Sequence, residues 1–383
     1  EFVGDTFPVF KFLRPADTAG GERKCLDLAL ARTERPLTGG GTRDFVTHSD
    51  TSITIEDDLA RRDFTWNAMA LDIVSGEFID PFGGISDLQN GIIRAVGNPA
   101  ERFLEDRTRC LRGLRFAATF GFLFEPATWK ALISFAPNMN DQRADGEFIL
   151  KRELVGREFA RSLERAPVAT LELWEQSGML GVLFPEIERL ARIEQRRDFH
   201  PEGDVMTHTK KALAALPANA DLSLIIATLF HDLGKATKFQ LFDRQTRTAL
   251  PLEISPEEFS TRHFDPQRHL IKNIDHEIDS EIMAADIMRR YAFAAVPGVD
   301  TDLIRYLVRE HMFHGLMNWK LAKIEKTLFD RQGRPLWGLY ELARVDAAGS
   351  HNDMTFAETV KHYIDEMLAL REEQAKVPAR VLD

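Results

Sequence analysis

The hydrophobic pattern of the chain changes partway along its length, and this change restricts the fold more than any single motif. Residues 7–12 and 25–31 are typical of short strands, with a turn-rich stretch at 17–21 between them. A helical period begins near Asp57, and beyond about Glu105 nearly every segment up to Arg371 is typical of helix. The pattern predicts an α+β protein, in which a small mixed β/α head precedes an all-α body.

Length and composition exclude several classes of protein. The 383 residues are enough for two or three domains, and 44% hydrophobic with 28% charged residues is ordinary for a globular protein. No apolar run approaches the roughly 18 residues of a membrane span, and the first residues do not resemble a signal peptide. We therefore expect a cytoplasmic protein without a membrane partner. The net charge of −11 argues against non-specific coating of nucleic acid but permits a local basic groove.

An arginine-rich segment at residues 101–116 is predicted to form one amphipathic helix. At about 100° per residue, Leu104 falls on one side, with Leu111, Leu114 and Ala118. The opposite side carries Glu105, Asp106, Arg109 and Arg112, and Arg115 lies near the boundary. Two interpretations are open. This face is either solvated and paired internally, or its carboxylates and guanidiniums bind the edge of a base and the oxygens of a triphosphate.

A second arginine pair, Arg61-Arg62, precedes Asp63-Phe64-Thr65 and is expected to open another helix. Asp63 and Asn67 would then lie one turn apart on the same face. On its own the pair is more typical of surface charge. Together with the turn-rich segment 80–88 and the arginine-rich segment, it favours nucleotide binding.

A group of histidines and acids in the helical body is typical of a metal site. His231-Asp232 follows an apolar helix and precedes Gly234, and this predicts two ligands exposed at the mouth of a buried face. The other candidates on separate segments are His208, His276, His311 and Asp346. Imidazole combined with carboxylate suits iron, manganese, nickel or zinc better than magnesium. A lone histidine is usually structural, but this combination is harder to explain in that way.

The run from Ile55 through Phe116 resembles the head and neck of class II tRNA nucleotidyltransferases, which are the CCA-adding enzymes and bacterial poly(A) polymerases. The resemblance extends over roughly residues 5–185. It implies nucleotide binding by Arg62, Asp63, Asn67, Glu105, Asp106, Arg109, Arg112 and Arg115. In that family Asp106 and Arg109 would read the base of CTP or ATP, while the other arginines would contact its phosphates or sugar. Asp27 would be a catalytic carboxylate, and Mg²⁺ the cofactor of transfer.

The chain departs from the family pattern in two places. Arg107 stands where the family has proline. The Gly-Gly-x-x-Arg-Asp turn and the Asp-x-Asp pair are not found before the first strand, and residues 40–44 only imitate the former motif. We therefore expect this chain to bind nucleotide poorly and to transfer nothing by itself.

Residues 200–350 resemble the HD phosphohydrolase superfamily. The resemblance implies a divalent transition metal held by His208, His231, Asp232 and Asp346, with His276 and His311 as the additional ligands of a binuclear site. Lys235 would lie near the phosphate.

Together the two resemblances imply four segments. These are a partial nucleotidyltransferase head (1–100), a helical neck (101–190), an HD domain (191–371) and a tail (372–383). The predicted function is CCA addition, complete or partial, to tRNA from CTP and ATP, combined with phosphatase or 2′,3′-cyclic phosphodiesterase activity. Two alternatives are an HD hydrolase with a vestigial head and a poly(A) polymerase-like enzyme. The sequence carries no prediction of an oligomeric state.

Overall fold

The computed structural model describes residues 2–3, 9–13, 25–36, 45–312, 319–330, 336–351 and 353–376. The chain divides into two compact units, Glu1–Lys151 and Arg152–Asp383. The boundaries predicted at residues 100 and 190 were assigned from motifs, not from packing, and they stay a prediction. No helix in the described ranges is both long enough and apolar enough to cross a membrane. The motif-like residues 40–44 lie outside the described residues.

The first unit begins with two small antiparallel sheets. One has the order β1-β2-β3 and the other pairs β4 with β5. The register places Phe10 opposite Leu28 and Phe12 opposite Leu26, so these apolar side chains share one face of the sheet. All of them are exposed. The bounds are β1 Phe2–Val3, β2 Val9–Leu13, β3 Cys25–Leu28, β4 Arg32–Pro36 and β5 Phe45–Ser49.

Short helices and strand pairs complete this unit. Thr54 begins α1 with a capping box to Asp57, which satisfies backbone N–H groups at the helix start. Gly121 takes a left-handed conformation and ends α4, as glycine readily does. The other elements are β6 Ala70–Leu71, β7 Phe78–Ile79, α2 Gly84–Asn90, β8 Ile92–Ile93, α3 Pro99–Glu105, β9 Leu123–Phe124 and α5 Pro126–Phe135, besides α1 Ile55–Ala60 and α4 Thr108–Phe120.

Two helix predictions in the first unit are wrong. Residues 101–116 do not form one helix, because the backbone at Asp106 is extended (φ −146°, ψ 106°) and separates α3 from α4. The helical phase is lost at this break. Leu104 is consequently 58% exposed, whereas Leu111 and Leu114 are fully buried and Ala118 is nearly so. Arg61 lies at the C-terminal end of α1 and does not open a helix.

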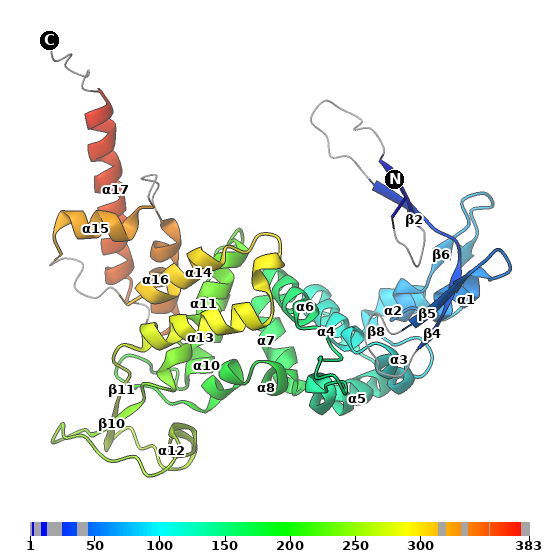
Figure 1. Ribbon diagram of the computed structural model, residues 1–383. Helices are drawn as coiled ribbons and strands as arrows, with labels where there is room; N and C mark the ends of the chain where they lie inside the picture. Colours follow the sequence, from blue (N-terminus) through cyan, green and yellow to red (C-terminus); the bar gives the residue numbers. More distant parts are fainter. Residues whose placement is uncertain are drawn as a thin grey trace. The chain divides into compact units, whose positions relative to one another are not determined.

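The second unit is almost entirely helical. Its central element is α11, in which every residue is buried and which packs against α10, α13, α14 and α16 (Figure 1). An antiparallel pair, β10 Gln240–Asp243 and β11 His269–Lys272, interrupts the helices, and the prediction that nearly every segment here is helical did not include it.

The helices of the second unit have the following bounds: α6 Arg152–Arg165, α7 Pro167–Gln176, α8 Met179–Leu183, α9 Pro185–Glu188, α10 Val205–Ala214, α11 Leu222–Phe230, α12 Pro256–Arg262, α13 His276–Arg290, α14 Thr301–Glu310, α15 Leu321–Leu328, α16 Trp337–Gly349 and α17 Thr355–Lys376. Asp204 and Asp221 accept backbone hydrogen bonds at the starts of α10 and α11.

A close approach between α6 and the end of α13 fixes one side of this unit. Phe159 stacks on Phe184 with ring centroids 4.4 Å apart, and Phe184 contacts Tyr291 at 4.5 Å. Gly156 lies one turn before Phe159, and a Cβ atom at this position would overlap the backbone carbonyl oxygen of Tyr291. The small side chain is therefore required by packing and not by backbone conformation.

We predict that Gly156→Ala destabilises the second unit by about 2 kcal/mol or more, because α6 must move away from a backbone atom that cannot rotate aside. Urea unfolding followed by tryptophan fluorescence would measure the change. Gly181→Ala is the matched control. Its new methyl group would meet nothing closer than Glu188 Cγ at 3.6 Å, so we expect stability within about 1 kcal/mol of the parent, or slightly above it. Equal effects of the two substitutions would contradict this packing argument.

Candidate functional site

The carboxylate of Asp63 contacts two other predicted nucleotide-binding residues of the first unit. Its Oδ2 accepts a hydrogen bond from Arg112 Nε at 2.7 Å, and its Oδ1 accepts one from Asn67 Nδ2 at 3.0 Å. The Asp63 carboxylate is buried, whereas the Arg112 side chain is 37% exposed. The guanidinium of Arg112 is thus oriented from one side and accessible from another.

Arg109 is held more tightly than a residue on a solvated helical face. Its Nη1 donates to Glu105 Oε2 at 2.7 Å and to the carbonyl oxygen of Arg102 at 3.0 Å, and its Nη2 donates to the carbonyl oxygen of Arg61 at 2.9 Å. The side chain is only 8% exposed. Arg109 does form an internal i,i+4 pair with Glu105, but it does not lie on a solvated face, because its side chain is buried and two of its three acceptors are backbone carbonyls.

Asp106 lies in the break between α3 and α4. Its Oδ1 accepts hydrogen bonds from the Thr108 backbone N at 2.9 Å and from Thr108 Oγ1 at 2.6 Å, an arrangement that starts the next helix. Burial raises the pKa of Asp106, although Thr108 and Arg109 oppose the shift. The expected placement of Asp106 with Arg109 on one helical face is wrong, because the two residues lie on opposite sides of the backbone break.

The remaining predicted residues of this unit are less enclosed. Arg62 is exposed and pairs with Asp58 at 3.2 Å, while the Arg115 guanidinium lies 4.2 Å from the ring centroid of Phe116. Asp27 is an exposed residue of β3, opposite Lys11 in the register. Among the described residues, every grouping with metal-binding geometry lies in the second unit. A Mg²⁺ site at Asp27 therefore stays a prediction.

The predicted metal ligands of the second unit come from the ends and faces of several helices. His231 follows α11 directly, His276 begins α13, and His311 follows α14. His208 and Asp346 lie within α10 and α16. These helices pack around α11, and this packing brings the side chains together.

One group of contacts surrounds the His208 and His231 rings. His208 Nε2 lies 2.9 Å from Asp346 Oδ1 and 3.3 Å from His231 Nε2. His231 Nε2 is also 3.2 Å from Asp232 Oδ2. His231 and Asp232 are fully buried and not exposed at a mouth, so that detail of the prediction is wrong. Asp346, whose side chain is 33% exposed, provides the opening to solvent.

A second group of contacts shares the Asp232 carboxylate. His276 Nε2 lies 3.0 Å from Asp232 Oδ1 and 3.2 Å from His311 Nε2, and His311 Nε2 is 3.9 Å from the same carboxylate oxygen. The ligand atoms of His208, His231 and Asp232 form one potential metal grouping, and those of Asp232, His276 and His311 form another. Asp232 is the common member, with one oxygen directed to each group.

The ring orientations test whether these residues fit a metal ion. His231, His276 and His311 each place Nδ1 within 2.8 Å of a backbone carbonyl oxygen. A carbonyl oxygen only accepts, so each Nδ1 carries hydrogen and each neutral ring directs the Nε2 lone pair inward. With neutral rings the Nε2 lone pairs would face each other at 3.2–3.3 Å beside two carboxylates, an arrangement that either a proton or a metal ion between them stabilises. The donor set therefore fits divalent transition metals, whose preferred ligands include imidazole and carboxylate.

The electrostatics of the metal-free cluster agree with this interpretation. Burial opposes a charge on His231, but the adjacent Asp232 and Asp346 raise its pKa to about 10. Burial and the nearby His276 and His231 lower the pKa of His311 to about 3. The pKa of Asp232 is held well below its usual range by His231 and Lys235, against the effect of burial. The site thus concentrates negative charge that protons and Lys235 neutralise in the absence of metal.

Two neighbours of this cluster, Lys235 and Glu202, make contacts that the sequence did not predict. Lys235 Nζ lies 2.7 Å from Asp232 Oδ2 and donates to Gln195 Oε1 at 2.6 Å. Glu202 Oε1 lies 2.9 Å from both His200 Nδ1 and His208 Nδ1. The only available signal was the run His200-Pro201-Glu202 shortly before α10, which by itself does not show which way the carboxylate turns.

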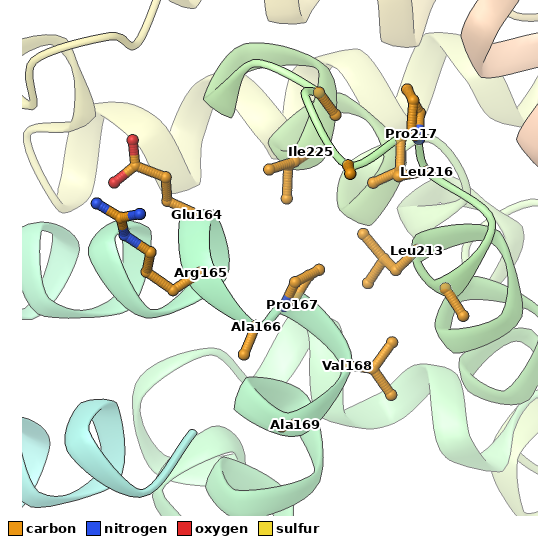
Figure 2. A pocket seen from close by; sticks show the side chains of 13 residues that line it. Glu164, Arg165, Ala166, Pro167, Val168, Ala169, Leu213, Leu216, Pro217 and Ile225 are labelled. Atoms are coloured by element: carbon orange, nitrogen blue, oxygen red, sulfur yellow. The ribbon is translucent and has the colours of Figure 1, made fainter. Parts of the chain in front are cut away.

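A hollow of about 370 Å³ elsewhere in the second unit is separate from these ligands. Figure 2 shows Glu164 and Arg165 on the side formed by α6, and Leu213 and Leu216 on the side formed by α10 and the turn after it. Apart from Glu164 and Arg165 its lining is apolar, and the lining contains no histidine. The candidate chemistry of this unit therefore lies at the histidine cluster and not in this hollow.

Comparisons with known proteins agree with the resemblance of the first unit. A family model described as the poly A polymerase head domain matches residues 16–94. A Multifunctional CCA protein from Xanthomonas campestris is 42% identical over 241 residues, covering 61% of this chain and 54% of the relative. One from Neisseria gonorrhoeae is 43% identical over 239 residues, covering 61% and 53%. The predicted resemblance to class II CCA-adding enzymes is confirmed.

A solved structure shows the same fold. The CCA-adding enzyme from Bacillus stearothermophilus, determined in complex with CTP, matches with a TM-score of 0.53 over 96% of this chain and 69% of that one. The identity is 17%, so this likeness concerns the fold alone. The chain spans about half the length of the curated CCA relatives, 54% and 53% for the two above.

We predict that Arg109→Ala lowers the free energy of unfolding of the first unit by about 3 kcal/mol, because it removes a buried guanidinium that donates to Glu105 and to two backbone carbonyls. Arg102 still donates to Glu105 at 2.9 Å, so the unpaired acceptor is chiefly the carbonyl oxygen of Arg61. Arg112→Ala, three residues along the same helix, is the comparison. Its side chain is partly solvated, so we expect a loss of about 1 kcal/mol or less. Chemical unfolding monitored by circular dichroism would measure both, and a larger loss for Arg112→Ala would contradict the assignment.

We also predict two transition-metal ions per chain, both of which depend on Asp232. His311→Ala should retain one ion, whereas Asp232→Asn should weaken both sites at least tenfold, because one carboxylate serves each group. Inductively coupled plasma mass spectrometry after loading with Mn²⁺ or Co²⁺ and gel filtration would count the ions. His263→Ala, an exposed histidine outside both groups, is the control. Loss of a single ion in Asp232→Asn would show that the carboxylate is not shared.

Proposed function

We propose that this chain is part of a tRNA nucleotidyltransferase that adds CCA, or part of it, to tRNA 3′ ends from CTP and ATP. We further propose that residues 191–371 form an HD-type phosphohydrolase. The identity of 42% to proteins named Multifunctional CCA protein supports the first activity. The Asp232 carboxylate shared by two groups of histidines is the single observation that carries the second.

In the transferase, Arg109 is suited to selecting a base. Its contacts with Glu105, Arg102 and Arg61 use three of the five guanidinium N–H groups and hold the plane of the group in place. Two N–H groups, including that of Nε, have no partner among the described residues. They can donate to acceptors on the edge of cytosine or adenine, and Asp106 would complete the template.

Phosphate and sugar contacts are assigned to arginines with accessible guanidiniums. Arg62 is 44% exposed and forms an ion pair with the buried Asp58. Arg112 is 37% exposed and forms an ion pair with the buried Asp63. Such a guanidinium keeps its charge at all relevant pH values and can bind phosphate oxygens in a forked geometry. Arg115, which lies over Phe116, and Asn67, which binds Asp63, would complete this set. Asp27 and Mg²⁺ stay in the proposal as the carboxylate and cofactor of transfer.

In the hydrolase, His208, His231, Asp232 and Asp346 would hold one metal ion, and Asp232, His276 and His311 a second. When bound, such metals supply a hydroxide nucleophile and polarise a phosphate ester. The residues of this chain would position the metal ions and the phosphate. The buried imidazoles fix the ligand directions, Lys235 places a positive charge beside Asp232, and the partly exposed Asp346 lies where a phosphate enters from solvent.

The experiment that tests this function uses the gene product that contains the chain. Labelled CTP and ATP are supplied with tRNAs that lack one, two or all three terminal nucleotides, and hydrolysis of 2′,3′-cyclic AMP is followed with Mn²⁺, Co²⁺ or Ni²⁺. Hydrolysis without any incorporation would favour a hydrolase with a vestigial head. Long AMP tails on RNA without CMP incorporation would favour a poly(A) polymerase.

We predict that two substitutions separate the activities. Asp232→Asn should lower hydrolysis at least 100-fold and leave CMP and AMP incorporation within twofold, because the polar partners of Asp232 in the described part of the chain belong to the histidine cluster and Lys235. Arg112→Ala should lower incorporation at least tenfold, mainly through weaker nucleotide binding, and leave hydrolysis unchanged. Parallel loss of both activities in either folded variant would contradict the assignment of separate sites.

A further inference from the structure

The histidines of the metal cluster do not all obtain their ring orientation in the same way. His231, His276 and His311 each donate from Nδ1 to the carbonyl oxygen three residues earlier in the chain, those of Thr228, Asn273 and Val308. His231 and His311 follow the C-terminal ends of α11 and α14, where backbone carbonyls are not fully used by helical hydrogen bonds. His276 begins α13, and its acceptor lies in the segment before that helix. In all three cases a nearby backbone carbonyl provides the acceptor.

His208 cannot use this solution, because it lies inside α10. The carbonyl oxygen three residues earlier belongs to Val205, the first residue of the helix, and it already accepts a hydrogen bond from Thr209 Oγ1 at 2.8 Å. An acceptor for His208 Nδ1 must therefore come from another side chain. Without one, the ring would be free to exchange tautomers or to rotate about χ2.

Glu202 provides this acceptor from the turn before α10. Its Oε1 lies 2.9 Å from His208 Nδ1, and its side chain is fully buried. The same oxygen lies 2.9 Å from His200 Nδ1. Gly203 comes next with φ of +111°, a conformation that side-chain-bearing residues rarely adopt, and Asp204 then caps the helix. The turn thus directs Glu202 back onto the first turns of α10.

We propose that Glu202 is a positioning residue of the metal cluster, which holds His208 with Nδ1 protonated and Nε2 directed at the metal. This inference rests on the metal-dependent function proposed above. A carboxylate does more here than the backbone carbonyls of the other histidines. It fixes the ring and also makes Nε2 a stronger donor to a cation, as carboxylate partners of metal-bound histidines generally do.

A second interpretation of the same atoms is that His200, Glu202 and His208 form a separate metal site, since their ligand atoms lie within 4.8 Å of one another. The geometry favours positioning. His208 faces Glu202 with Nδ1 and faces Asp346 with Nε2, at 2.9 Å in both cases, so binding a metal on each side would require the ring to lose both protons.

Three variants test the inference in the full chain. Glu202→Ala removes the acceptor and its charge. Glu202→Gln removes the charge, but it can keep both contacts because both end on a single oxygen. Glu194→Gln is the matched control, since Glu194 lies in the same loop, pairs with Arg197 at 2.8 Å and is in no metal grouping. Affinity for Co²⁺ is measured by competition with a chelator, alongside the visible spectrum of bound Co²⁺ and the melting temperature of the metal-free protein.

We expect Co²⁺ affinity to fall 10- to 100-fold in Glu202→Ala, to fall less in Glu202→Gln and to be unchanged in Glu194→Gln, with an altered Co²⁺ spectrum in the alanine variant. Folding is checked in each variant, and the glutamine variant serves if the alanine variant does not fold. Unchanged affinity and spectrum in Glu202→Gln and Glu202→Ala would overturn the inference. So would a third Co²⁺ per chain that only the Glu202 variants lose.

The outcome separates this inference from the proposed hydrolase. A Glu202 effect on Co²⁺ affinity in a protein that hydrolyses no phosphate ester would support the positioning role and overturn the hydrolase. Hydrolysis by the parent protein with no Glu202 effect would do the reverse. A parent protein that binds no Co²⁺ would overturn both.

Discussion

The buried carboxylate of Asp232 is the constraint on which the second unit depends. A carboxylate that is only 1% exposed is costly unless every side of it is compensated. Here Oδ2 lies near His231 and Lys235, and Oδ1 lies near His276. His231 and Lys235 are close to Asp232 in the sequence, whereas His276 begins the distant helix α13. Full compensation of this carboxylate therefore requires α13 to pack at the end of α11.

The apolar character of α11 explains how such a group can be buried at all. Every residue of this helix is buried, and the chain passes from Phe230 directly into His231 and Asp232. Burial of the apolar side chains stabilises the position of the helix. Because the polar pair follows the helix directly, its position is fixed as well. His231 and His311 both gain their ring orientation from carbonyls at helix ends, whereas His208, inside α10, depends on Glu202.

The sequence predicted the histidine cluster better than the arginine segment, for a physical reason. Ligand chemistry is carried by residue type, and an apolar stretch as uniform as α11 identifies the helix that ends at the His231-Asp232 pair, although not that the pair is buried. The arginine segment was predicted from periodicity alone, which fails where the backbone breaks. The extended conformation at Asp106 shifts the phase, exposes Leu104 and buries Arg109. The pairing of β10 with β11 was missed because it joins strands far apart in sequence, which local pattern does not report.

The arginines that follow the break at Asp106 differ in how tightly their guanidinium groups are held. Arg109 is buried and bound by a carboxylate and two backbone carbonyls, so moving it would break three hydrogen bonds at once. Arg112, on the same helix, is partly solvated, and its bond to Asp63 can be replaced by water or by an incoming anion at little cost. A rigid guanidinium is suited to discriminate between bases, because discrimination depends on donors that cannot adapt. A partly solvated guanidinium is suited to phosphate, whose charge can be met from many directions.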